Sequence, residues 1–159
     1  MDLRESVRAL ILDENDQVLL VRFDWDGLDV PGGFWANPGG GIELGEGREE
    51  ALARELLEEV GLQIFDIGPE VWTKTALFPM AHWDGQVDHI HLLRVQHFVP
   101  EPRLTAGQLL AENVHELRWW TPDELVASDA TFAPRALPTL LMTLLSSETP
   151  TQPLAITGF

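Results

Sequence analysis

GGIELGEGREEALARELLEEVGL, residues 40 to 62, joins a glycine-rich start to a helix-forming run that ends at a glycine. At about 100° per residue, Glu55, Glu58 and Glu59 share one face of the predicted helix. The opposite face is apolar and carries Ala53, Leu56, Leu57 and Val60. Like charges three or four residues apart destabilise a helix by about 0.2–0.5 kcal/mol per pair, so the acidic face needs a counter-charge. A divalent cation with oxygen ligands would supply it.

The residues around this helix favour a ligand site over a solvated acidic face, which is the ordinary interpretation of a glutamate-rich helix. Pro38 and glycines 39–41 predict a tight loop whose backbone can approach a ligand closely. Glu46, between two glycines, lies near the positive end of the predicted helix dipole. Gly61 stands where a helix commonly ends at a C′ glycine. A glycine-rich loop therefore leads into a short helix that carries an acidic cluster.

The stretch resembles the Nudix box, G-x5-E-x7-R-E-U-x-E-E-x-G-U, in which U is a bulky aliphatic residue. Every specified position is matched, by Gly40, Glu46, Arg54, Glu55, Leu56, Glu58, Glu59, Gly61 and Leu62. The resemblance implies an α/β fold, the Nudix-type α/β/α sandwich with a mixed β-sheet. It also implies a metal-dependent hydrolase that cleaves a diphosphate linkage in a nucleoside diphosphate joined to a further moiety.

The resemblance implies a metal-binding role for several residues of the box. Glu58 and Glu59 are expected to bind Mg²⁺, with Mn²⁺ a possible substitute, and the carbonyl of Gly39 or Gly40 is expected to join them. Glu55 is expected to be a metal ligand or a general base acting on the attacking water. In such sites the metal polarises the phosphoryl group and lowers the pKa of bound water.

The remaining residues of the box are expected to position the others or to contact substrate. Arg54 is expected to take part in catalysis by orienting the glutamates through ion pairs. Gly40, Gly41 and Glu46 are expected beside the substrate. For Glu46, a purely structural role at the helix start, held by backbone N–H groups, is an equal alternative.

Many Nudix enzymes recruit one further carboxylate from outside the box. Glu112 and Glu116 both precede the apolar end of a predicted strand. We predict that Glu112 is the additional metal ligand and catalytic group, because it follows Gly107 in a connecting segment. Glu116 falls where the pleat of a strand would fix its direction. Glu101 is a third, more distant candidate.

The aromatic residues and histidines suggest where a substrate could bind. A tryptophan at the mouth of the site could stack a nucleobase, which is worth about 1–3 kcal/mol per base. Most of the six tryptophans are expected in the core, and Trp25 and Trp83 are the predicted substrate contacts. His82, His89 and His91 could contact phosphate, although histidines in strands more often satisfy local hydrogen bonds.

The composition fits one globular domain, predicted over residues 1–147 and followed by an extended tail over 148–159. The absence of cysteine excludes disulfides and thiolate zinc sites and is compatible with the cytoplasm. No signal peptide or membrane-spanning run is recognised, so no membrane partner is expected. The net charge of −16 disfavours long nucleic acid as a partner but allows a small phosphorylated substrate, such as a nucleotide derivative, that arrives with metal ions.

Hydrophobic patterning outlines the secondary structure. Strands are predicted over residues 6–12, 17–22, 64–67, 71–78, 89–99 and 116–120. Helices are predicted over the box from Arg48 to Val60, after Thr121, and from near Pro134 to Leu145. Residues 23–34 and 106–113 are expected to be loops.

Two other classes of function compete with the hydrolase. A Nudix-fold sensor would bind a nucleotide metabolite without turnover, but the intact acidic cluster disfavours it. A structural domain that merely buffers Ca²⁺ would leave the glycine-rich loop unexplained. The substrate stays open among nucleoside triphosphates, ADP-ribose, dinucleoside polyphosphates, nucleotide sugars and non-nucleotide diphosphates, and a homodimer is possible.

Overall fold

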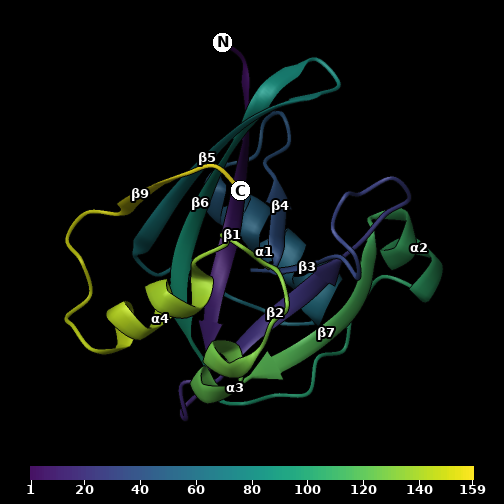
Figure 1. The fold of residues 1–159 in the computed structure, drawn as a ribbon. Helices are drawn as coiled ribbons and strands as arrows, with labels where there is room; N and C mark the ends of the chain where they lie inside the picture. Colours follow the sequence, from purple (N-terminus) through teal and green to yellow (C-terminus); the bar gives the residue numbers. More distant parts are fainter.

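A computed structural model describes residues 1–159 and contains one nine-stranded mixed sheet with helices on both of its faces (Figure 1). The strand order is β8-β3-β2-β1-β6-β5-β9, with β4 paired to β1 and β7 paired to β2. The elements are β1 (Leu3–Leu12), β2 (Val18–Phe23), β3 (Phe34–Ala36), β4 (Gly39–Gly41), α1 (Arg48–Val60), β5 (Glu70–Met80), β6 (Trp83–Arg94), α2 (Ala106–Ala111), β7 (Val114–Trp120), α3 (Pro122–Ala127), β8 (Phe132–Ala133), α4 (Leu137–Leu145) and β9 (Leu154–Thr157).

The strand β1 is buried on both faces because two separate hydrophobic clusters lie on either side of it. Successive side chains of a strand point to opposite faces. Leu10 and Leu12 therefore join the cluster that contains residues of α3 and α4, whereas Ala9 and Ile11 join the cluster built on α1. Figure 1 shows α1 behind the sheet and α3 and α4 in front of it. The predicted α/β/α sandwich with a mixed sheet is confirmed.

The predicted box helix is confirmed as α1, Arg48–Val60, and its end is fixed by Gly61. Gly61 adopts φ 73°, and its N–H donates to the carbonyl of Leu57, which closes the last turn. The buried side of the helix differs from the predicted one. Ala53 and Leu57 are only half-buried, and the fully buried apolar residues are Ala51, Leu52, Leu56 and Val60.

Several predicted boundaries are wrong. Residues 64–67 form no strand, although Ile64 and Ile67 pack against the hydrophobic cluster on α1. The strand predicted over 89–99 runs from Trp83 to Arg94 and pairs with β5 as a hairpin. The glycines at 39–41, expected in a loop, form β4 against β1. Glycines lack the side-chain alternation by which a strand is recognised, so the pattern could not show this pairing.

The segment 106–113 is not a loop, because residues Ala106–Ala111 form the helix α2. Its N-cap Thr105 accepts the N–H of Gln108, whose side chain in turn accepts the N–H of Thr105, and this capping box starts the helix. At the other end of the chain, α4 begins at Leu137, three residues later than predicted. None of the helices has the length and apolar character needed to cross a membrane.

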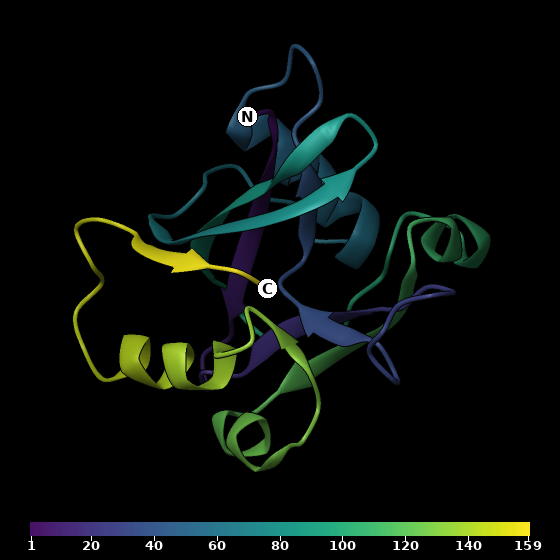
Figure 2. The ribbon, with the colours of Figure 1, turned by 45° about the horizontal axis from the view of Figure 1, so that its top comes forward.

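The segment 148–159, expected to be extended, contains β9. This strand runs parallel to β5, with Trp72 opposite Leu154 and Thr75 opposite Thr157. Figures 1 and 2 show that the chain turns back after α4, forms β9, and ends near the centre of the molecule.

Candidate metal centre and adjoining pocket

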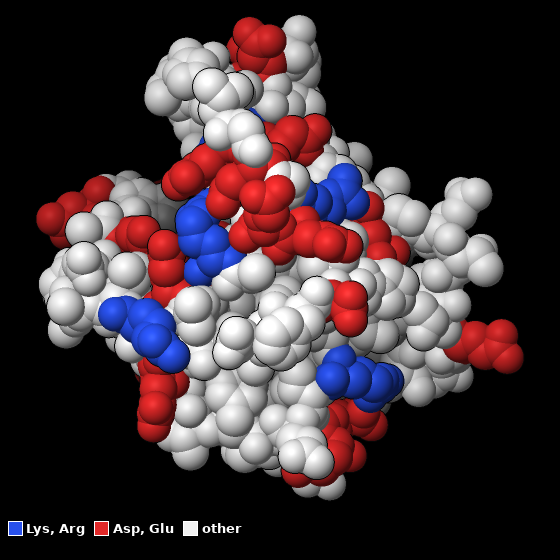
Figure 3. Space-filling view, turned by 180° about the vertical axis from the view of Figure 1, so that it is seen from behind, with Lys and Arg blue, Asp and Glu red and all other residues white.

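Three carboxylates converge where α1 faces β4 and the end of α2. One oxygen from each of Glu55, Glu59 and Glu112 lies within 4.8 Å of the others. We call these residues the acidic cluster. They line a cavity of about 280 Å³ together with the three glycines of β4 and with Arg4, Arg8 and Phe23. Figure 3, which views the molecule from behind, shows acidic side chains gathered around a few basic ones on the upper part of this face.

The backbone of β4 lies directly against the glutamates and against β1, and Gly39 is the position where glycine is required. A Cβ added to Gly40 would lie 2.6 Å from an oxygen of Glu55. Gly39 adopts φ 142°, and a Cβ there would overlap the carbonyl of Val7 in β1. The N–H of Gly39 donates to Glu59 Oε1 at 2.9 Å. The backbone of β4 therefore contacts the acidic side chains directly, through an amide group of a strand.

Burial sets the electrostatics of the cluster. Glu59 is 2% exposed, and desolvation, reinforced by the charge of Glu55, raises the pKa of its carboxyl to about 8. Desolvation is also the main cause that raises the pKa of Glu55 and of Glu112. Three carboxyl groups that each disfavour ionisation here form a strong site for a positive charge, because a cation stabilises all three ionised forms together.

Arg54 forms hydrogen bonds or ion pairs with several acidic residues of the box. Its Nε and Nη2 donate to the two oxygens of Glu46 at 2.8 and 2.9 Å, and its Nη1 donates to Glu55 at 2.9 Å. Glu58 lies 3.7 Å from the same Nη1. The bidentate hydrogen bonds from Arg54, with the N–H of Glu43, lower the pKa of Glu46 to about 2.

Glu46 is thus a partner of Arg54 and is not one of the three residues of the acidic cluster. Glu58, predicted as a ligand, lies outside the three-residue cluster, and its side chain is 31% exposed. Its charge still raises the pKa of Glu112, so it lies beside the cluster. Gly41 contacts Arg54 through its carbonyl oxygen, which accepts from Nη2 at 3.2 Å.

The three acids considered outside the box have different positions. Glu112 ends α2 and belongs to the acidic cluster. Glu116 lies in β7 and pairs with Arg22 at 3.1 Å. Glu101, in the segment between β6 and α2, lies beside the end of α1, where its N–H donates to the carbonyl of Val60.

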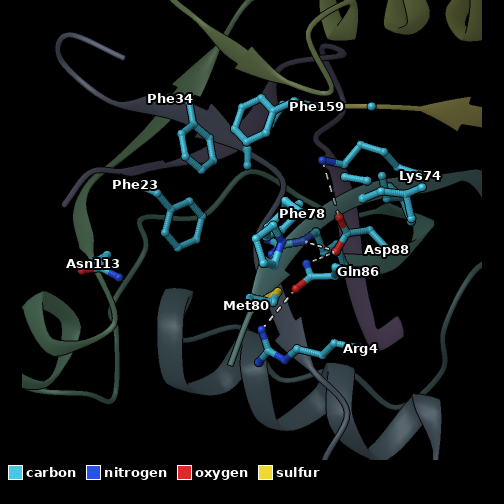
Figure 4. Close-up of a pocket in the computed structure, with 18 of the residues that line it drawn as sticks. Arg4, Phe23, Phe34, Lys74, Phe78, Met80, Gln86, Asp88, Asn113 and Phe159 are labelled. Atoms are coloured by element: carbon cyan, nitrogen blue, oxygen red, sulfur yellow. Dashed lines mark hydrogen bonds and ion pairs between the residues drawn. The ribbon is translucent and has the colours of Figure 1, made fainter. Parts of the chain in front are cut away.

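A second cavity of about 800 Å³ adjoins the acidic cluster and shares Arg4, Arg8 and Phe23 with it. We call it the aromatic pocket. Figure 4 shows the rings of Phe23, Phe34, Phe78 and Phe159 around it, with polar side chains along another side. Its lining also includes Trp25, which is 42% exposed and lies edge-on to Phe34 at 5.8 Å between ring centroids.

The polar side of the aromatic pocket is organised around Asp88, which is 3% exposed. Asp88 accepts hydrogen bonds from Arg8 Nε at 2.9 Å, from Gln86 Nε2 at 2.8 Å and from the hydroxyl of Ser6. Lys74 Nζ lies 3.6 Å away. Desolvation opposes ionisation of Asp88, but the charges of Arg8 and Lys74 outweigh it and lower its pKa to about 2.

The other predicted substrate contacts lie elsewhere. Trp83 begins β6 beside His82, at 4.6 Å between ring centroids, and lines neither cavity. His89 contacts the carboxylates of Glu5 and Glu70, and His91 donates to a backbone carbonyl. These histidines make local structural hydrogen bonds.

A family model decides the identity of the fold. The NUDIX domain model matches residues 2–140. The chain belongs to the Nudix family. The nucleoside triphosphatase NudI of Salmonella newport (strain SL254) is 31% identical over 138 residues, which are 84% of this chain and 94% of that relative. The NudI of Escherichia coli (strain SE11) is 29% identical over 136 residues, with the same coverage of both chains.

Solved Nudix structures share the fold. The NUDIX domain of Shewanella oneidensis NrtR, complexed with ADP ribose, aligns with a TM-score of 0.66 at 19% identity, covering 91% of this chain and 90% of that chain. The MutT NUDIX hydrolase from Burkholderia pseudomallei aligns with a TM-score of 0.63 at 22% identity, covering 91% and 99%. With its family, its relatives and its complete box, this chain is a Nudix pyrophosphohydrolase.

Several residues of this Nudix enzyme's aromatic pocket were not predicted from the sequence. Arg8 and Lys74 are polar residues within largely apolar strand sequences, and this signal could have identified them. Asp88 stands among other polar residues of β6, so the sequence does not single it out. Phe34 and Phe159 carry no comparable signal, because aromatic residues at the start of a short strand and near the end of the chain are ordinary.

Proposed function

We propose that this enzyme is a divalent-metal-dependent hydrolase that cleaves a diphosphate linkage in a nucleotide, with nucleoside triphosphates as its first candidate substrates. The observation that carries the proposal is the junction of two cavities. The acidic cluster, suited to a cation and a phosphate chain, opens beside an aromatic pocket suited to a base. Arg4, Arg8 and Phe23 line both.

The donor set fits a hard cation. Glu55, Glu59 and Glu112 offer only carboxylate oxygens, the ligands that Mg²⁺ and Mn²⁺ prefer. Without a cation, burial, reinforced by repulsion from neighbouring carboxylates, raises the pKa of all three carboxyl groups and makes their ionised forms unfavourable. These three residues would hold the metal, and Glu58, next to Glu59 in α1, would add negative charge beside it. When bound, the metal would polarise the phosphoryl group and acidify its bound water.

The protein's own residues set the geometry around that ion. Arg54 holds Glu55 in place through the hydrogen bond at 2.9 Å. Glu112 comes from a different element, so it completes the cluster only in the folded protein. Arg4 lies against Gly41 and between the two cavities. A guanidinium group there suits the charge of a phosphate chain that passes from one cavity to the other.

The aromatic pocket supports a nucleotide over a non-nucleotide diphosphate. Aromatic rings provide surfaces for a base, while Lys74, with three N–H donors, can donate a hydrogen bond to a polar group at its edge. A simple sugar or polyphosphate would leave these rings unused. The activity named for the NudI relatives, nucleoside triphosphatase, supports the same class of substrate.

A substrate panel tests the proposal. Purified enzyme is incubated with nucleoside triphosphates, ADP-ribose, dinucleoside polyphosphates, nucleotide sugars and a base-free polyphosphate, each with Mg²⁺, Mn²⁺ or EDTA. Release of phosphate, pyrophosphate and nucleoside monophosphate is measured. We expect divalent-dependent release of nucleoside monophosphate from at least one nucleotide and none with EDTA. Turnover that persists in EDTA, or binding of every nucleotide without turnover, would contradict the proposal.

A further inference from the structure

The end of the chain is built into the wall of the aromatic pocket. The backbone of β9 pairs with β5 along Trp72 to Thr75, and the N–H of Gly158 donates to the carbonyl of Thr75 at 2.9 Å. These bonds deliver the next residue, Phe159, to the centre of the molecule, where Figures 1 and 2 mark the end of the chain.

The ring of Phe159 is fixed by contacts from three other parts of the chain. It lies edge-on to Phe34, at 4.9 Å between centroids and 81° between planes. Lys74 Nζ lies 5.2 Å and Arg135 Cζ 4.9 Å from its centroid, both within the range of cation–π interactions. The carbonyl of Phe159 accepts the N–H of Arg135 at 3.3 Å. These contacts hold the ring of Phe159 in one position in the wall of the pocket.

Phe159 leaves space for a ligand. It is 37% exposed and is one of the residues that line the aromatic pocket, together with Phe34 and Lys74. The volume of about 800 Å³ is the space that remains with the ring in place. Figure 4 shows Phe159 beside Phe34 and across the pocket from Arg4, one of the three residues that also border the acidic cluster. The ring thus stands at the end where a base would lie when the phosphates reach the metal.

The family model ends at residue 140, so neither β9 nor Phe159 belongs to the matched domain. The core of the fold supplies the acidic cluster and most of the pocket. A segment beyond that core supplies one aromatic wall. Such a segment can alter the choice of substrate without disturbing the residues that bind the metal and the diphosphate.

We propose that Phe159 is a specificity-determining residue, whose ring forms with Phe34 the wall against which the base of the substrate packs. The inference rests on the proposed function, in which the substrate is a nucleotide. Loss of the ring removes a contact that is made equally before and during the reaction. Such a loss raises KM and leaves kcat unchanged.

Steady-state kinetics on Phe159→Ala, Phe159→Tyr and the control Leu154→Ala tests the inference, with the nucleotide that wild-type enzyme hydrolyses best. Leu154 lies in β9, is 52% exposed and does not line the aromatic pocket. We expect Phe159→Ala to raise KM by about fivefold to 150-fold, the value of one lost base–aromatic contact. Phe159→Tyr, which keeps the ring, and Leu154→Ala should retain the wild-type KM.

Competitive inhibition by inorganic pyrophosphate supplies a second readout, because this ion has no base. Its inhibition constant should be unchanged in Phe159→Ala. The inference would be overturned if KM in that variant were unchanged or lower, or if pyrophosphate bound more weakly in parallel with the nucleotide. Hydrolysis of nucleotides by the wild-type enzyme would still support the proposed function. Wild-type enzyme that hydrolyses no nucleotide would instead overturn the proposed function, and the inference with it.

Discussion

Glu59 lies where almost no water reaches it, and the N–H of Gly39 is its hydrogen-bond donor. An ionised carboxylate in such a place needs a cation within reach. Its neighbour Glu58 is more exposed and pairs with Arg54. Two adjacent glutamates of the box therefore have different surroundings, and the two should differ when they are substituted.

Glu59→Gln should abolish divalent-dependent turnover, because it removes the charge of a buried carboxylate that we propose as a metal ligand while keeping the shape of the side chain. Glu58→Gln should also lower turnover strongly, through loss of charge at the rim. Circular dichroism should show an unchanged fold for both, and phosphate release under saturating substrate measures the activity. Wild-type turnover in Glu59→Gln would refute the metal assignment.

The metal-free protein should lose stability as pH rises, because Glu59 has a pKa of about 8 when folded and an ordinary value of about 4.3 when unfolded. Between these values the folded state holds a proton that the unfolded state has released. This stabilisation is complete below the unfolded pKa and is lost as pH rises through about 8.

Glu59→Gln stays neutral throughout, so its free energy of unfolding in EDTA should increasingly exceed that of wild type from about pH 5 to about pH 8. Denaturant melts at several pH values measure the difference. Parallel pH profiles for the two proteins would show that Glu59 ionises normally in the fold.

Glu112→Gln should lower kcat far more than it weakens substrate binding, because its carboxylate completes the acidic cluster. Glu116→Gln, the matched control, loses only a half-exposed ion pair with Arg22, which is worth about 0–1 kcal/mol. Kinetics on both variants decides between the two acids. A large loss in Glu116→Gln beside near-normal Glu112→Gln would reverse the assignment.

At the scale of elements, the end of α1 organises the segment that carries Glu112. The carbonyl of Glu58 accepts the N–H groups of Arg103 and Leu104, and Val60 accepts that of Glu101. The chain then enters α2 at Thr105 and presents Glu112 at its end. The same helix that carries the box therefore also positions the acid from outside it.

Gly61→Ala should destabilise the protein by about 2 kcal/mol, because φ is positive there and the new Cβ would overlap the carbonyl of Glu101. It should also lower turnover by moving the segment that leads to Glu112. Gly107→Ala is the control, since this exposed residue of α2 has open space around it. Gly107→Ala should increase the free energy of unfolding by at most about 1 kcal/mol, because alanine is favoured over glycine inside a helix. Denaturant unfolding measures both, and a neutral Gly61→Ala would show that the cap is dispensable.

The strongly patterned elements could be predicted from the sequence, and the residues explain why. Arg48–Val60 carries helical periodicity and a terminal glycine, and its bounds are confirmed. β4 and β9 could not be predicted, since a run of glycines and a short exposed segment owe their strand pairing to partners distant in sequence. The burial of Glu59 could not be predicted from the periodicity of α1 either, because it depends on the packing of β4 against this helix.

At the scale of the whole molecule, the charge of −16 is concentrated in part at the candidate metal centre. Any cation would screen such a protein, so general screening must be separated from specific binding. The acidic cluster offers the distinction, because Mg²⁺ there would bind only the folded state.

Millimolar Mg²⁺ or Mn²⁺ should raise the melting temperature, and EDTA should reverse the rise. KCl at equal ionic strength serves as the control and should give a smaller shift. In Glu59→Gln the difference between Mg²⁺ and KCl should disappear. Equal shifts with both salts in wild type would indicate screening alone and count against a preformed site.

The pairing of β1 with β6 has a consequence for how the chain folds. These strands are parallel and join residues 82 positions apart, such as Ser6 and Asp88. Contacts of such long range form slowly, because a large loop must close before they add stability. During synthesis, β1 must wait until β6 has left the ribosome, while α1 can form locally. Until then, the edge of β1 that β6 covers has unpaired backbone groups, which favour aggregation and chaperone binding.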